Sequence, residues 1–172
     1  MIKQLIIGRL RETQRVNMEE VIGFMNSNHF FDKACHSHHR YGGGLAHHAW
    51  QTYLIALDLV NERHKRTPDA PPIDLDSIAI FALLHDLCDC TGFKDLRGHG
   101  RRSAKILKEL GLSLSLDEFL AIRFHMSLRK NTNHILYNEA SVCELRAIIH
   151  KADCKSACMR KGYLPYDVQS KV

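Results

Sequence analysis

Seven consecutive apolar residues, Ile78-Ala79-Ile80-Phe81-Ala82-Leu83-Leu84, run directly into His85 and Asp86. A helix that is apolar on every face is typical of a segment buried all round. We expect this helix to continue to about Thr91-Gly92. An ionised carboxylate beside such a core costs several kcal/mol unless it pairs with a cation or binds a metal. Asp86 is therefore expected to have a positively charged partner.

Helical periodicity continues on both sides of this segment. Asn17 and Glu20 form a capping-box pattern that predicts a helix to about Ser27, and Gly111 is a typical C-terminal glycine. The short proline-rich linker at residues 67–73 joins two helices inside one domain. The predicted helices cover about 17–27, 45–63, 74–92 and 98–111, with further ones beginning near 117 and 139. No alternating strand pattern is present, so the predicted fold class is all-α, a compact bundle of about six or seven helices.

Composition limits the class of protein. The chain has 172 residues, 45% hydrophobic and 25% charged, which excludes a disordered chain and suits one domain over 1–172, with 1–27 as an N-terminal helical segment. No apolar run reaches the roughly 20 residues of a membrane span, and no export signal is evident. We therefore expect a cytoplasmic protein with no membrane partner and with its six cysteines as thiols. The net charge of +5 favours anionic partners without by itself indicating nucleic acid.

Twelve histidines are an unusual number for this length. Histidine is the commonest metal ligand in proteins. Several histidines and aspartates fall on or next to the apolar faces of successive predicted helices: His48, His85, Asp86, His99, His125 and Asp153. A single buried histidine is usually a structural residue, whereas six such residues indicate a common cause. A metal centre at the axis of the bundle would provide it.

The order His48, His85-Asp86, Asp153 resembles the H…HD…D signature of the HD-domain phosphohydrolase superfamily. The local contexts are similar as well. They are Gly43-Gly44-Leu45-Ala46-His47-His48, Leu83-Leu84-His85-Asp86-Leu87-Cys88 and His150-Lys151-Ala152-Asp153. The similarity covers residues 30–157, the expected core of the domain, and implies an HD-domain-like all-α fold.

Two further segments resemble HD proteins that have additional histidine ligands. They are Gly98-His99 followed by Ser103, and Ala121-Ile122-Arg123-Phe124-His125-Met126. The resemblance implies that one metal is held by His48, His85, Asp86 and Asp153. Asp86 would then bridge to a second metal held by His99 and His125. Such a histidine-rich set favours one or two divalent transition metals per chain, Mn²⁺, Fe²⁺, Co²⁺, Ni²⁺ or Zn²⁺, over Mg²⁺.

Substrate contacts are expected on either side of this centre. The loop His38-His39-Arg40-Tyr41-Gly42-Gly43-Gly44-Leu45 resembles the HHxxPGGL segment of certain HD-domain 3′–5′ exonucleases, with Gly42 in place of proline. We expect phosphate contacts from His38, His39 and Arg40, and from the basic residues Lys94, Arg97, Arg101 and Arg102. A solvated loop and a solvated charged helix face are the alternatives.

Asp89 departs from the family pattern, since many HD enzymes carry a lysine three residues after the motif aspartate and some nucleotidases carry a glutamate. We expect Asp86 and Asp89 to be catalytic, with Asp89 protonating a leaving alkoxide or orienting water. A solvated carboxylate at a helix end is the alternative.

The resemblance implies a metal-dependent phosphohydrolase, a phosphoric ester hydrolase that acts on a nucleotide or another small phosphorylated molecule. Two alternatives stay open. One is a 3′–5′ exonuclease whose partner is an oligonucleotide, and the other is a non-catalytic HD module that senses metal or nucleotide.

Overall fold

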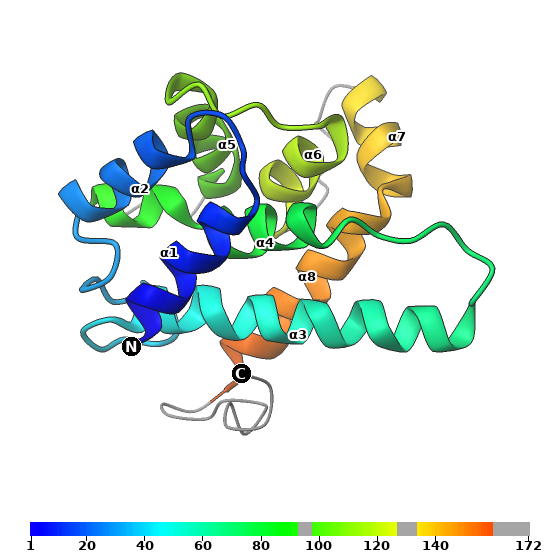
Figure 1. Ribbon diagram of the computed structural model, residues 1–172, viewed down its shortest axis with the longest axis horizontal. Coiled ribbons are helices and arrows are strands. Elements are labelled where there is room, and N and C mark those ends of the chain that lie inside the picture. Colours follow the sequence, from blue (N-terminus) through cyan, green and yellow to red (C-terminus); the bar gives the residue numbers. More distant parts are fainter. Residues whose placement is uncertain (93–97, 127–133, 160–172) are drawn as a thin grey trace.

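The computed structural model describes residues 1–92, 98–126 and 134–159 of the chain (Figure 1). In these ranges the elements are α1 (Ile2–Glu12), α2 (Met18–Ser27), α3 (Gly44–Arg66), α4 (Leu75–Leu84), the 3₁₀ helix η1 (Leu87–Thr91), α5 (His99–Glu109), α6 (Leu116–Phe124), α7 (His134–Val142) and α8 (Glu144–Ala157). The described residues contain no strand, so the all-α class is confirmed. They form eight α-helices, one or two more than the sequence indicates.

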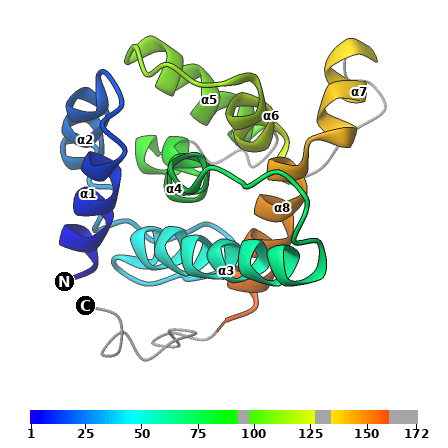
Figure 2. The same cartoon turned by 45° about the vertical axis from the view of Figure 1, so that its right-hand side comes forward.

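Helix α4 is the centre of the fold. Every residue from Ser77 to Leu84 is buried, as the apolar run predicts. Helices α1, α3, α6 and α8 pack around it, and the long helix α3 also packs along α8. In both views α1 and α2 cover one end of the molecule and α7 lies at the opposite end (Figure 1, Figure 2).

Helix α4 ends earlier than the sequence predicts. The α-helix stops at Leu84 with His85 as its C-cap, and a separate 3₁₀ helix follows up to Thr91. Asp86 lies between the two helices, at φ −105° and ψ 21°, outside regular helical geometry. In a 3₁₀ helix residues three apart lie on one side, and the backbone N–H of Asp89 donates to the carbonyl of Asp86 at 2.9 Å. The break therefore places Asp86 and Asp89 on one side of the chain.

The predicted capping box at Asn17 is wrong. Asn17 has a left-handed backbone, φ 64°, and its side chain makes no cap hydrogen bond. Its amide instead donates to the carbonyl of Gly111 at 2.9 Å, which ties the α1–α2 turn to the end of α5. A capping box is present at α6, where Ser115 and Glu118 satisfy each other's backbone N–H groups.

The helix expected to begin near residue 139 is two helices. Helix α7 ends at Val142, and Cys143 has the extended backbone of an N-cap for α8. Val142 is 80% exposed, because it belongs to α7 and not to the helix that packs on α3. Ile149 and Ala152 of α8 are fully buried.

The N-terminal segment is helical and covers the core. Ile6 and Leu10 of α1 are fully buried. Arg15, after α1, donates to the fully buried carboxylate of Glu118 at 2.7 Å, and Ser77 donates to the same oxygen at 2.7 Å. These two donors and the backbone N–H of Ser115, which donates to the other carboxylate oxygen at 2.7 Å, compensate the burial of that charge.

No helix in the described ranges combines the length and the apolar character that crossing a bilayer requires. All six cysteines are free thiols.

Candidate metal centre

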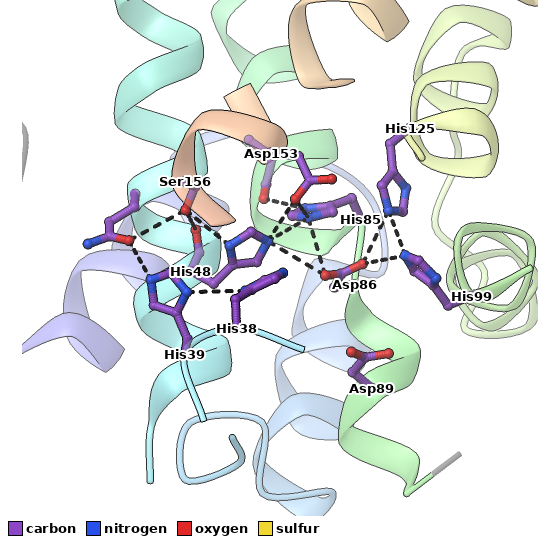
Figure 3. Close-up of polar contacts among 12 residues, drawn as sticks. His38, His39, His48, His85, Asp86, Asp89, His99, His125, Asp153 and Ser156 are labelled. Carbon is purple, nitrogen blue, oxygen red and sulfur yellow. Dashed lines mark hydrogen bonds and ion pairs between the residues drawn. The ribbon is translucent and has the colours of Figure 1, made fainter. Parts of the chain in front are cut away.

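Five elements bring the six predicted ligand residues to one place (Figure 3). His48 comes from α3, His85 and Asp86 follow α4, His99 begins α5, His125 caps α6 and Asp153 lies on α8. Each of the six is at most 8% exposed. Their convergence across more than 100 residues of sequence is a property of the fold, whereas their role as ligands is a proposal taken up below.

The first group lies where α3, α4 and α8 meet. Nε2 of His48 is 3.1 Å from Oδ1 of Asp153 and 3.2 Å from Nε2 of His85. Oδ2 of Asp86 is 3.4 Å from Nε2 of His85 and 3.6 Å from Nε2 of His48. Four side chains thus direct ligand-type atoms toward one another.

The second group lies where α5 and α6 meet. Oδ1 of Asp86 is 3.1 Å from Nε2 of His99 and 3.3 Å from Nε2 of His125. The two imidazole nitrogens are 2.8 Å apart. Asp86 therefore uses one carboxylate oxygen toward each group.

The chemistry of these donors fits divalent metal ions. Nδ1 of His85 donates to the carbonyl of Ala82 at 2.9 Å, and Nδ1 of His125 donates to the carbonyl of Ile122 at 2.8 Å. The lone pair of each neutral ring is then on Nε2, facing a carboxylate and another imidazole. Lone pairs that converge in this way repel unless a cation lies between them. Ligands bound at about 2.1 Å to one ion lie roughly 3.0–3.4 Å apart, close to the separations found here.

The carboxylates and imidazoles of the first group shift one another's pKa values in the direction that favours positive charge beside Asp86 and Asp153. Burial disfavours a charged His85, but the carboxylates of Asp86 and Asp153 outweigh it and raise the pKa of His85 to about 9. Burial likewise opposes the ionised form of Asp86 and Asp153, yet the surrounding imidazoles hold the pKa of each carboxyl well below its usual range. The carboxylates of Asp86 and Asp153 therefore favour a positive charge at this position.

Two glycines allow the close approach of the helices that carry the ligands. A Cβ on Gly100 would overlap the carbonyl oxygen of Ile122 and lie 3.0 Å from Nδ1 of His125. Glycine at this position lets the first turn of α5 reach the end of α6. A Cβ on Gly44, at the start of α3, would overlap the carbonyl of His39.

Helix α8 holds the end of α6 in place. Nε of Arg146 donates to the carbonyl of Phe124 at 3.2 Å, and Nδ1 of His150 donates to the carbonyl of His125 at 2.6 Å. These donors satisfy carbonyls that a helix C-terminus leaves without partners. Sequence reasoning missed both residues. His150 and Arg146 lie one and two helical turns before Asp153 on α8, and this spacing was the available signal.

Asp89 opens onto the same small pocket as Asp86, His99 and Asp153. The pocket is lined by Cys35, His36, Ser37, His38, Asp86, Asp89, His99, Met126 and Asp153. Burial and the charge of Asp86 raise the pKa of Asp89 to about 6. Asp89 is half-buried and lines this pocket, and its catalytic role stays a prediction. His36 and Met126 are pocket residues that the sequence did not indicate.

The three loop residues expected at phosphate occupy different positions. The His38 ring lies 4.4 Å from that of His48 and lines the pocket, and burial and His48 lower the pKa of His38 to about 4. His39 is buried with Nε2 2.7 Å from Oε1 of Gln51, and Arg40 is exposed. Neither His39 nor Arg40 lines the pocket.

The predicted cationic clamp lies only partly in the described chain. Lys94 and Arg97 fall outside the described residues. Arg101 is exposed and Arg102 half-buried on α5, and neither lines the pocket. Phosphate binding by these four residues stays a prediction.

A sequence model of the HD domain family matches residues 45–158, well over half of the chain and all six residues of the two groups. The chain therefore belongs to the HD domain family, a superfamily of metal-dependent phosphohydrolases whose domains bind divalent metals. No curated protein and no solved structure matches the chain.

Proposed function

We propose that this protein is a phosphohydrolase that uses two divalent transition-metal ions to cleave a phosphoester of a nucleotide or another small phosphorylated molecule. The observation that carries the proposal is the position of Asp86, whose two oxygens face two neighbouring histidine groups. A carboxylate shared in this way is a typical bridge between two ions. A site with a single ion at the first group would leave the buried side chains of the second group, Asp86 with His99 and His125, without an ion to bind.

The ligand sets follow from the two groups. We assign the first ion to His48, His85, Asp86 and Asp153, and the second to Asp86, His99 and His125. Their imidazole content supports Mn²⁺, Fe²⁺, Co²⁺, Ni²⁺ or Zn²⁺ over Mg²⁺. When bound, such ions lower the pKa of water and withdraw charge from phosphoryl oxygens.

The chain's own residues then have separate tasks. Asp86 supplies negative charge to both halves of the centre and fixes their spacing. Asp89, on the same side of the 3₁₀ helix and in the same pocket, is placed to give a proton to the leaving alkoxide oxygen. His38 approaches the pocket from the loop before α3. This division of roles favours turnover over a module that only binds.

A small substrate is favoured over an oligonucleotide. The exonuclease alternative depends on the loop at 38–45 and on the basic segment that includes Lys94 and Arg97. Of the three predicted loop contacts, His38 alone lines the pocket, and Lys94 and Arg97 lie outside the described residues. Phosphate release from a panel of nucleotides and sugar phosphates with added Mn²⁺ tests the proposal, with Asp86→Asn as the control. Release of phosphate by the wild type alone supports it. Shortening of a labelled oligonucleotide without release from any small ester would favour the exonuclease, and binding without either product would favour the sensor.

A further inference from the structure

A chain of hydrogen bonds joins the loop that carries His38 and His39 to helices α3 and α8, next to His48 of the first group (Figure 3). Nδ1 of His38 is 3.1 Å from Nδ1 of His39, whose Nε2 is 2.7 Å from Oε1 of Gln51. The same Oε1 is 3.4 Å from Oγ of Ser156, and that Oγ is 3.0 Å from Nδ1 of His48. Gln51 is 1% exposed and Ser156 and His48 are fully buried.

The direction of each hydrogen bond at Ser156 follows from its partners. Besides Nδ1 of His48, its hydroxyl has two neighbours, Oε1 of Gln51 at 3.4 Å and the backbone carbonyl of His48 at 3.3 Å. Both are carbonyl oxygens, which only accept. When the hydroxyl proton points to one of them, Oγ accepts from Nδ1–H of His48, and this is the arrangement that gives all three contacts a donor and an acceptor. The lone pair of His48 is then on Nε2, the atom that faces Asp153 and His85.

The same reasoning extends from Gln51 into the loop. Because Oε1 only accepts, Nε2 of His39 must carry its proton, which leaves the lone pair of His39 on Nδ1. Nδ1 of His38 then donates to it, so the lone pair of His38 is on Nε2. His38 thus offers its pocket an acceptor nitrogen.

We propose that Gln51 and Ser156 are positioning residues that fix the tautomers of His48, His39 and His38. The consequence for His48 rests on the proposed function, because it gives the first ion a ligand atom that is already free of a proton. The consequence for His38 replaces the expected phosphate contact: an acceptor nitrogen receives a hydrogen bond from water or from a substrate hydroxyl and repels a phosphate oxygen. Partners behind a metal-bound histidine commonly change metal affinity by about 10- to 100-fold.

The tautomers can be read directly by two-bond ¹H–¹⁵N NMR of the metal-free, ¹⁵N-histidine-labelled protein, about two pH units above the ordinary imidazole pKa of about 6.5. We expect a proton on Nδ1 of His48 and His38 and on Nε2 of His39. Finding His48 or His38 protonated on Nε2, or His39 on Nδ1, would overturn the proposal without any variant.

Variants separate the network from simple packing. Gln51→Met removes the shared acceptor and should scramble the His39 and His38 tautomers, whereas Gln51→Glu should keep them. Ser156→Ala should disturb His48 alone and lower first-ion affinity about 10- to 100-fold with the second ion retained. Thr52→Val is the matched control, since Thr52 is the next residue of α3, fully buried, with a hydroxyl that has no hydrogen-bond partner in the described structure.

Unchanged tautomers in Gln51→Met would contradict the proposal. Correct tautomers in a wild type that binds no metal would instead contradict the proposed function.

Discussion

The hydroxyl oxygen of Ser103 lies 3.1 Å from the backbone nitrogen of Cys88 and accepts its hydrogen bond. Cys88 also directs its thiol to the carbonyl of His99 at 3.3 Å. These two contacts fasten the first turn of α5 to the segment that directly follows Asp86. They explain why His99, one turn before Ser103, reaches the Oδ1 atom of Asp86 although 13 positions separate the two in sequence.

The first prediction concerns metal content. His99→Ala and His125→Ala each remove a ligand of the second group and leave the first group intact. Anaerobic loading with Mn²⁺ or Fe²⁺ followed by elemental analysis should give up to two ions per chain for the wild type and one fewer for each variant. Equal metal content in all three proteins would rule out a dinuclear centre.

The second prediction uses the contact between α5 and α6. Gly100→Ala places a methyl group against the carbonyl of Ile122, so α5 must shift and His99 must move from His125. We expect loss of the second ion and a lower melting temperature. Gly8→Ala is the control, because a Cβ at this helical position meets nothing within 4 Å and should raise the stability by roughly 0.5–1 kcal/mol. Retention of both ions by Gly100→Ala would show that the close packing is not required.

The third prediction concerns Asp89. Asp89→Asn keeps the size of the side chain but removes its proton-donating carboxyl group. Turnover of an alkyl phosphoester should fall by roughly 10²–10⁴-fold with metal content unchanged. The loss should be smaller for nitrophenyl phosphate, whose leaving group needs no proton. An unchanged rate on the alkyl ester would exclude Asp89 from the reaction.

The fourth prediction concerns Asp86 and stability. Thermal unfolding of the wild type with metal at a hundredfold excess over its dissociation constant should show a gain of roughly 2.7 kcal/mol. Asp86→Asn removes the charge that both ions would share, so it should gain little from metal and lose hydrolysis. Its metal-free form should still fold, because the buried face of α4 is unchanged. A variant stabilised by metal as strongly as the wild type would remove Asp86 from the centre.

The fold class and the convergence of the six residues could be predicted from the sequence. The apolar run before His85 identifies a buried helix from local information alone, and the contexts around His48 and Asp153 match a known pattern. The misses have a physical cause in long-range contacts. Asn17 gives up its cap to bind Gly111, 94 residues away. The sequence around His85 continues the helical pattern, but the α-helix ends there because tertiary contacts outweigh local propensity.

The supporting contacts were harder to predict than the six clustered histidines and aspartates. Arg146, His150 and Ser156 act through backbone carbonyls or through another side chain, and such partners follow from packing geometry. The position of His39 could not be predicted from the sequence for the same reason, because its burial against Gln51 depends on how the loop before α3 folds onto that helix.

The most direct test of the central claim is anomalous diffraction from crystals loaded with Mn²⁺, measured at a wavelength where manganese scatters anomalously. We expect two peaks on opposite sides of the Asp86 carboxylate, one beside His48, His85 and Asp153 and the other beside His99 and His125. A single peak, or peaks away from Asp86, would contradict the central claim.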